Sequence, residues 1–200
     1  AKTELSQEQR RIADYLSRSA DSLSGILTEL LEISRFDAGA VQSCPAPVPA
    51  AEIFHRIDTE FSPLARVKGL RFKFFFPQKG IVLFTDQKML LNLLQNLIDN
   101  AFKYIETGGV LVAIRSRGDR ALIQVWDTGI GIAPEYIEAI FDEYFQIGNP
   151  QRDRARGLGL GLSIVRRLAK TLGCQVSCQS RPGKGSVFEF HLPLVDETIR

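Results

Sequence analysis

The chain has 200 residues, which is room for one ordinary domain with an appendage, so the chain itself cannot hold a large multidomain assembly. Hydrophobic residues make up 44% and charged residues 24%, and this composition excludes disorder of the whole chain. The formal net charge of +2 argues against nucleic acid as the main ligand, because nucleic-acid binders concentrate basic residues on one face.

Two further properties concern the cellular compartment. No apolar run approaches the ~20 residues of a membrane span, and the first residues lack the apolar core of a signal peptide. Cys44, Cys174 and Cys178 are an odd number of cysteines, which makes a disulfide framework improbable. We therefore expect a cytoplasmic chain without direct membrane contact, although a longer parent protein is compatible with an inner-membrane anchor.

A long helix is predicted over residues 3–38, which contain no proline. Its apolar residues repeat every seven positions, as in the seam of a coiled coil. The two lines of the seam hold Leu5, Ile12, Ser19, Ile26 and Ile33, and Leu16, Leu23 and Leu30. Such a stripe must pack on another helix or a second copy of the chain, unless it lies on the chain's own globular part.

A proline-rich segment follows this helix. Pro45, Pro47 and Pro49 predict a stiff, extended linker after Gly39 ends the helix. The expected division is a helical segment over residues 1–40, the linker over 41–49, a globular domain over 50–195 and a tail over 196–200.

The globular part contains both helical and strand patterns. Helical spacing is found over residues 50–68, 86–104 and 159–172, with a short helix from Pro134 to Phe141. Strands are expected over residues 70–74, 81–84, 110–117, 121–127, 175–180 and 186–192. Residues 142–156 are polar and aperiodic, and we expect a mobile loop there. Helices and mostly antiparallel strands in separate runs predict an α+β fold, a two-layer α/β sandwich.

The first candidate binding segment lies near the end of the predicted helix 86–104. Its polar residues are spaced by four, three and one, which places them on one helical face: Asn96, Asn100, Lys103 and Tyr104. Carboxamide oxygens can ligate Mg²⁺, and an ammonium group can contact phosphate oxygens. The alternative is an ordinary polar face of an amphipathic helix.

Two glycine-containing segments follow. Asp127 ends a predicted strand, where its carboxylate can accept a hydrogen bond from an exocyclic amine, and Gly129 and Gly131 let the backbone approach a planar ring. Gly157, Gly159 and Gly161 precede a helix, whose free N–H groups and dipole favour a polyphosphate. Neither G-x-G-x-x-G after a strand nor G-x-x-x-x-G-K-[ST] is present. The hairpin turn at residues 183–186 carries little separate weight.

In this order, the segments resemble the catalytic, ATP-binding domain of two-component sensor histidine kinases, within the GHKL ATPase superfamily. Residues 96–104, 127–132, 141–145 and 157–161 are similar to its asparagine box, first glycine box, phenylalanine box and second glycine box. The resemblance covers about residues 49–193 and implies the GHKL (Bergerat) ATP-binding fold within a larger kinase, with a hybrid architecture left open. Residues 30–39 resemble the second helix of the dimerisation and phosphotransfer domain, which implies a homodimer.

The resemblance also implies a role for each matched residue. Asn100 would ligate Mg²⁺, with Asn96 assisting directly or through water, and Lys103 would contact phosphate. Tyr104 would lie beside the adenine, and Asp127 would accept from its amino group. The base pocket and the phosphate cradle would be completed by Gly129, Gly131, Ile132, Gly157, Gly159, Leu160 and Gly161. Residues 142–156 would form the ATP lid.

The histidines depart from the family pattern. The family phosphorylates a histidine of the first bundle helix, normally followed by Glu or Asp. In this chain His55 is followed by Arg56, and His191 lies in a predicted closing strand with its side chain outward, so neither fits a phosphoacceptor. We therefore expect transfer of the ATP γ-phosphate to a histidine outside this chain, for relay to an aspartate of a response regulator receiver domain.

Two other functions stay open at this point. ATP hydrolases of the superfamily carry a glutamate as general base four residues before the metal asparagine, where this chain has Asn96, and an amide cannot take up the proton. A non-catalytic module, in which the first helix pairs with another kinase, is disfavoured by the intact glycines and by Asn100.

Overall fold

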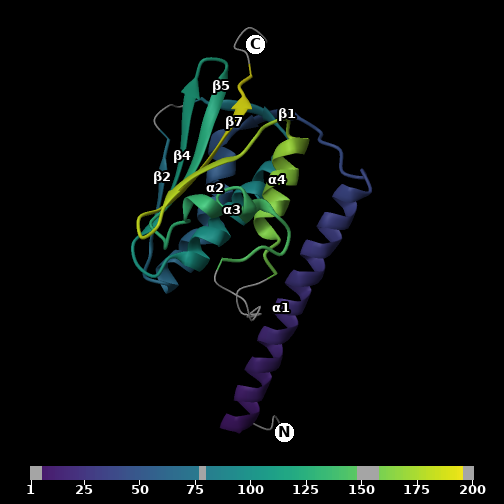
Figure 1. Ribbon diagram of the computed structural model, residues 1–200, viewed down its shortest axis with the longest axis vertical. Helices are drawn as coiled ribbons and strands as arrows, with labels where there is room; N and C mark the ends of the chain where they lie inside the picture. Colours follow the sequence, from purple (N-terminus) through teal and green to yellow (C-terminus); the bar gives the residue numbers. More distant parts are fainter. Residues whose placement is uncertain (1–5, 77–79, 148–157, 196–200) are drawn as a thin grey trace.

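A computed structural model describes residues 6–76, 80–147 and 158–195. Its first element is a long helix, α1 (Gln7–Asp37), which Ser6 caps by accepting from the backbone N–H of Gln9 while the Gln9 side chain accepts from the Ser6 backbone. This helix projects from one side of the molecule (Figure 1). Residues 3–5, which were also predicted helical, lie outside the described ranges.

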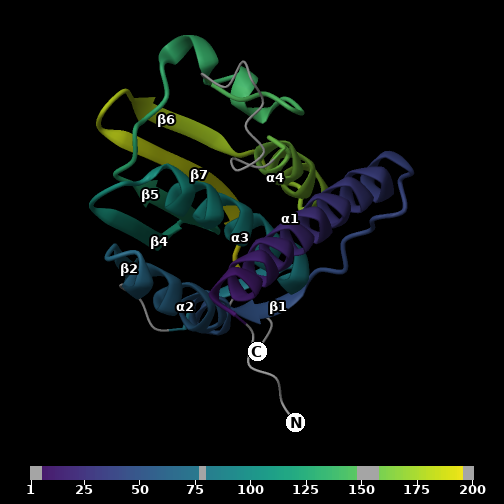
Figure 2. The same ribbon diagram turned by 90° about the horizontal axis from the view of Figure 1, so that it is seen from below.

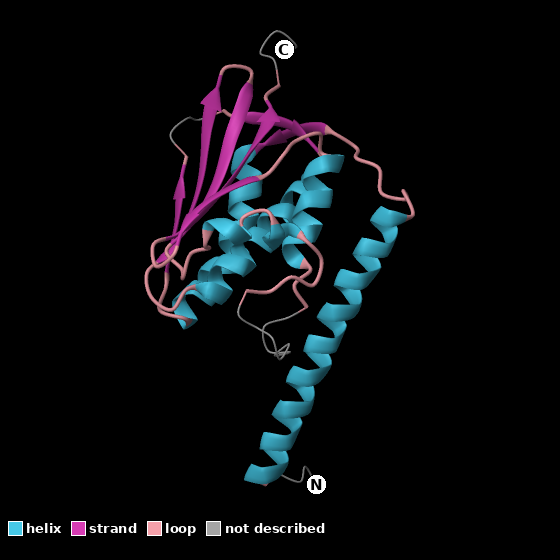
Figure 3. Cartoon of the chain, in the orientation of Figure 1, coloured by secondary structure: helices cyan, strands magenta, loops and turns pink. Residues whose placement is uncertain are grey.

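The centre of the fold is a five-stranded sheet in the order β2 (Arg71–Phe75), β4 (Gly109–Arg117), β5 (Arg120–Asp127), β7 (Gly185–Pro193) and β6 (Ser177–Arg181). The β2–β4 pair is parallel and the other pairs are antiparallel. Three helices cover one face of this sheet, α2 (Ala50–Val67), α3 (Gln87–Tyr104) and α4 (Gly161–Thr171) (Figure 3). The predicted two-layer α/β sandwich is therefore confirmed.

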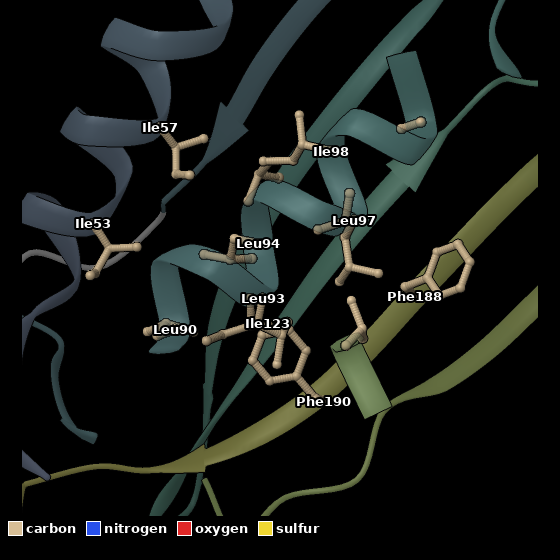
Figure 4. Close-up of a cluster of buried hydrophobic side chains, with 14 of the residues drawn as sticks. Ile53, Ile57, Leu90, Leu93, Leu94, Leu97, Ile98, Ile123, Phe188 and Phe190 are labelled. Atoms are coloured by element: carbon tan, nitrogen blue, oxygen red, sulfur yellow. The ribbon is translucent and has the colours of Figure 1, made fainter. Parts of the chain in front are cut away.

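The hydrophobic core lies between these two layers (Figure 4). Leucines spaced three or four residues apart on α3 face the sheet, each at most 1% exposed: Leu90, Leu93, Leu94 and Leu97. Alternate residues of the sheet, such as Ile123 and Phe190, point toward them. Because one face of α3 is packed into the core, the polar residues outside that face are held in fixed positions.

The proline-rich segment was predicted as a stiff, extended linker; it is extended, but it also pairs with the domain. Ala46–Pro49 forms strand β1, which pairs antiparallel with β3 (Val82–Thr85). Val48 is only 5% exposed, and its burial holds the segment against the domain. Prolines are tolerated there because an edge strand needs only part of its N–H groups for pairing.

Two helix boundaries also differ from the predictions. Residues 134–141 form two 3₁₀ turns, η1 (Pro134–Tyr136) and η2 (Ala139–Phe141), instead of one short helix. Arg166 Nη2 donates to the Glu138 carbonyl oxygen at 3.3 Å, so this oxygen faces α4 at the break between the turns. Helix α4 begins two residues late because Gly159 has a φ of +77°, which is incompatible with a right-handed helix.

The last turns of α1 are docked on the domain, with Ile33 7% exposed and Leu30 and Phe36 packed against the core. Ile12 and Leu16, earlier on the same helix, are 55% and 61% exposed. The predicted seam is thus split between a docked end and an exposed stretch. None of the helices in the described ranges combines the length and apolar character needed to cross a membrane.

Candidate functional site

A cavity of about 240 Å³ lies between α3, the end of β5 and the start of α4. It is lined by ten of the residues predicted from the sequence: Asn96, Asn100, Lys103, Tyr104, Asp127, Gly131, Ile132, Gly159, Leu160 and Gly161. Gly129 lies behind the lining, and Gly157 lies outside the described residues. The fold therefore brings three separate sequence segments to one cavity.

Helix α3 supplies the polar wall of the cavity. Asp86 caps this helix by accepting from the backbone N–H groups of Lys88 and Met89. The helical spacing then turns Asn96 and Asn100, in the C-terminal half of α3, toward the cavity. Lys103 lines the same wall, so two carboxamides and one ammonium group face a common space.

The carboxamide of Asn96 has a defined orientation. Its Nδ2 donates to the backbone oxygen of Asn92 at 2.9 Å and to Asn92 Oδ1 at 2.7 Å. Its Oδ1 is turned toward the start of α4, where a Cβ added at Gly161 would lie 3.2 Å away. Gly161 therefore leaves room beside an oxygen that can act as a ligand in the cavity.

Asp127 ends β5 on the opposite side of the cavity. Its Oδ1 accepts from the backbone N–H of Gly129 at 2.7 Å, and Ser186 of β7 is its register partner. Burial raises the pKa of Asp127 above its usual range, while hydrogen bonds from Gly129 and Ser186 oppose this rise. The result is a partly buried hydrogen-bond acceptor at the end of a strand.

The backbone N–H groups of the loop after Asp127 donate hydrogen bonds on both sides of the loop. Ile130 N donates to the Tyr104 carbonyl oxygen at 3.2 Å, and Ile132 N donates to Ser180 Oγ at 2.8 Å. A Cβ at Gly129 would lie only 2.7 Å from the Tyr104 oxygen, so the loop can approach α3 only with glycine there. Gly129 thus shapes the cavity without lining it.

The start of α4 is the third wall. Leu160 occupies its N-cap position and makes no side-chain capping bond, in contrast to Ser6 of α1 and Asp86 of α3. The first N–H groups of α4 therefore receive no bond from the side chain at the N-cap position, and they lie where Leu160 and Gly161 line the cavity. An uncapped helix N-terminus of this kind favours a negatively charged ligand.

Sequence reasoning missed several lining residues. The apolar ones are Ala101, Ile130, Ile140, Phe145, Ile147, Leu158, Leu162 and Phe188. Phe145 belongs to the recognised phenylalanine box, which was a usable signal. Ser186 was also missed, since it lines the cavity only through the pairing of β7 with β5. Of the predicted lid, residues 148–156 lie outside the described ranges, and residues 142–147 contain no helix or strand.

Asp99, another missed lining residue, predicts a pH effect on stability. Burial raises its pKa to about 6, Glu60 adds to the rise and Lys68 opposes it. Because the folded pKa lies above the unfolded value of 3.8, the stability that Asp99 contributes is fully present below about pH 4 and is lost as the pH rises through about 6. We expect Asp99→Asn to become progressively more stable relative to the parent as the pH rises from about 4 to about 6.

Urea unfolding of both proteins between about pH 4 and pH 7 measures this difference. Asp99 is partly exposed, so solvent screening limits its size. A stability difference between variant and parent that does not change with pH would contradict the prediction.

A family profile described as histidine kinase-, DNA gyrase B-, and HSP90-like ATPase matches residues 85–196. The chain belongs to this ATPase family. The matched range contains α3, the loop after Asp127 and α4, which are the walls of the cavity. The predicted family is therefore confirmed.

Individual relatives of this ATPase domain are sensor histidine kinases. RcsC of Escherichia coli (strain K12) is 30% identical over 192 residues, which cover 96% of this chain and 20% of that protein. The aerobic respiration control sensor protein ArcB of the same strain is 34% identical over 203 residues, which cover 98% of this chain and 26% of that protein. The chain thus spans about a fifth to a quarter of the length of these two relatives.

A solved structure agrees with these sequence relationships. Full-length ShkA, crystallised in complex with AMPPNP, matches with a TM-score of 0.83 and 31% identity over 96% of this chain and 40% of that chain. The similarity to ShkA, RcsC and ArcB extends beyond the ATPase domain, because it includes nearly the whole chain. The chain therefore carries the ATPase catalytic domain of sensor histidine kinases.

Proposed function

We propose that this chain binds ATP with Mg²⁺ and transfers the γ-phosphate to a histidine outside the chain, for relay to an aspartate of a response regulator. The observation that carries the proposal is the convergence of three groups on one cavity. They are the partly buried acceptor Asp127, the carboxamides of Asn96 and Asn100, and the start of α4, which has no side-chain cap. The AMPPNP complex of the similar kinase ShkA supports an adenine nucleotide as the ligand.

The two ends of the cavity suit different parts of ATP. At the Asp127 end, the carboxylate accepts from the adenine amino group, with Ile132 and Tyr104 beside the ring. At the other end, Lys103 and the first N–H groups of α4 attract the phosphates. Phe188 and Leu162 of the lining exclude water from the bound nucleotide.

The donor set also suits Mg²⁺, which prefers oxygen ligands and usually shares its shell with phosphates and water. Asn100 would hold the ion, with Asn96 Oδ1 directed into the same space. When bound, Mg²⁺ neutralises charge on the phosphate oxygens and so assists their transfer. The chain's own part is to keep both carboxamides in place on the rigid face of α3.

Phosphotransfer is favoured over hydrolysis by Asn96. Its Nδ2 is a donor to Asn92, and its amide oxygen cannot accept the proton of an attacking water as a carboxylate can. A histidine that brings its own nucleophilic nitrogen does not need such a base at this position. The residue at the position of the hydrolase glutamate therefore supports a kinase.

The acceptor histidine is proposed to lie outside this chain. His55 on α2 and His191 on β7 are both exposed, and neither lines the cavity. The exposed stretch of α1 offers a docking surface for an acceptor helix, with large apolar residues in sequence order: Ile12, Tyr15, Leu16, Leu23, Leu27 and Leu31. We infer that this surface forms the helical interface of a homodimer in the cytoplasm, where ATP and the receiver domain are available.

Labelled ATP tests this function. We expect the isolated chain to bind Mg²⁺–ATP in calorimetry but to remain unlabelled, because neither histidine reaches the cavity. It should label the histidine of an added dimerisation domain taken from a related kinase whose own ATPase domain is inactivated. Acid-labile phosphate on His55 of the isolated chain, or no binding of Mg²⁺–ATP, would refute the proposal.

A further inference from the structure

A line of hydrogen-bonded side chains leads from α1 to the cavity. Asn92 Nδ2 donates to Glu32 Oε1 at 3.0 Å, and Asn96 Nδ2 donates to Asn92 Oδ1 at 2.7 Å. Glu32 lies on α1, whereas both asparagines lie on α3, one helical turn apart. This line, Glu32–Asn92–Asn96, joins the two helices. The residues of its first bond, Glu32 and Asn92, are 60 residues apart in the sequence.

The direction of every bond in the line follows from its chemistry. An ionised carboxylate can only accept, so Glu32 requires the NH₂ group of Asn92. The oxygen of Asn92 is then turned toward Asn96 and requires the NH₂ group of that side chain. The same NH₂ group also meets the Asn92 backbone oxygen, which is likewise only an acceptor. Asn96 must therefore present its oxygen to the cavity.

Glu32 reaches Asn92 at the docked end of α1. Among the described side chains of this end, Ile33 is buried, and Leu30 and Phe36 are partly buried. Helix α1 contacts α4, and its N-terminal part projects away from the domain (Figure 1; Figure 2 gives the view from below). Because Ile12 and Leu16, earlier on α1, are exposed, the helix is held to the domain near its end, and the bond between Glu32 and Asn92 depends on the position of that end.

We propose that Glu32 is a positioning residue, which acts through Asn92 to orient the Asn96 carboxamide and so makes the affinity for Mg²⁺–ATP depend on the docking of α1. The proposal rests on the proposed function, because it assigns Asn96 to the metal and phosphate end of the nucleotide. When α1 moves away, Asn92 loses the acceptor that fixes its orientation. The Asn92 amide can then rotate, so that its NH₂ group, in place of its oxygen, faces the NH₂ group of Asn96.

The coupling must act in both directions. If docked α1 strengthens nucleotide binding, bound nucleotide must strengthen the docking of α1 by the same factor. Amide hydrogen exchange should therefore slow at residues 30–37 when Mg²⁺–ATP is added. In Glu32→Ala this slowing should be reduced.

Calorimetry on the full chain measures the first effect. We expect Glu32→Ala to bind Mg²⁺–ATP about five-fold more weakly than the parent, which corresponds to one hydrogen bond of typical net strength. Glu32→Gln retains an acceptor oxygen and should stay within about two-fold of the parent. Glu52→Ala removes the same charge from an exposed site on α2 and should leave binding unchanged.

Two further measurements separate positioning from general structural damage. Adenosine has no phosphates, so its affinity should be equal in the parent and in Glu32→Ala. In an Asn92→Ala background, Glu32→Ala should change the Mg²⁺–ATP affinity by less than about two-fold, because the line is already broken. Equal losses for adenosine and Mg²⁺–ATP, or full additivity of the two substitutions, would overturn the proposal.

The outcomes also distinguish this proposal from the proposed function. A parent chain that fails to bind Mg²⁺–ATP refutes the function itself. A parent that binds, together with Glu32→Ala that binds equally well and gives the same exchange pattern at residues 30–37, refutes only the role of Glu32.

Discussion

Replacing Asp127 by Asn is expected to weaken ATP binding by about ten-fold to one hundred-fold, consistent with ~1–3 kcal/mol for an unsatisfied polar contact. The carboxylate accepts from Gly129 N and still has acceptor capacity toward the cavity. In the variant the amide oxygen must serve the N–H of Gly129. The NH₂ group is then left to face the adenine amino group, which is also a donor.

Calorimetric titration with Mg²⁺–ATP measures this loss, and Asp119→Asn is the matched control. Asp119 lies exposed in the β4–β5 turn, so the same chemical change there should leave the affinity within about two-fold of the parent. If Asp127→Asn bound ATP as tightly as the control, the adenine assignment would be wrong.

The same carboxylate predicts a pH dependence of binding. Because burial raises the pKa of Asp127, protonation removes acceptor capacity at a higher pH than for an ordinary aspartate. Affinity should therefore be present above the raised pKa and decline as the pH falls through it. In Asp127→Asn this position no longer titrates, so the ATP affinity of the variant should fall less with decreasing pH than that of the parent.

Replacing Gly131 by Ala is the second change with a large expected effect. Gly131 has a φ of +70°, and a Cβ there would overlap the carbonyl oxygen of Arg181 and lie 3.0 Å from Pro182 Cα. Backbone strain of ~1–2 kcal/mol adds to an overpacking cost of ~1–3 kcal/mol, so we expect the free energy of unfolding to fall by about 2–5 kcal/mol. The displaced loop should also weaken ATP binding at least ten-fold, because Gly131 and Ile132 line the cavity.

Gly118→Ala separates these two causes. Gly118 has a similar φ of +63° in the β4–β5 turn, but nothing lies within 4 Å of an added Cβ. This control should therefore lose only the strain part of the stability, ~1–2 kcal/mol, and should bind ATP normally. Urea unfolding and calorimetry of both variants check the comparison, and identical behaviour of the two would show that the contact with Arg181 has no effect.

Most of the candidate site was predictable because its signals are local. The spacing of Asn96, Asn100 and Lys103 matches the helical period, so their common face follows from the sequence once the leucines of α3 define the buried side. Asp127 is likewise placed by the alternation of its strand, which ends there. The missing side-chain cap of α4 follows from Leu160 at the N-cap position, because a leucine side chain cannot accept a hydrogen bond.

Other features depend on which distant segments pair. Ser186 lies beside Asp127 only because β7 pairs with β5 in one register, and the turn that precedes it gave no sign of this. Pro45, Pro47 and Pro49 correctly indicated an extended segment, but its pairing with β3 depends on the burial of Val48 against the domain.

By itself, the sequence determined the order of most helices and strands, the layered α/β architecture and the polar groups available to a nucleotide. These follow from periods of two and 3.6 residues, which each segment carries within itself. Only the tertiary structure decided that α1 docks through Ile33 and that Glu32 meets Asn92. Such contacts are set by the packing of whole elements, and no local period records which distant side chain will face another.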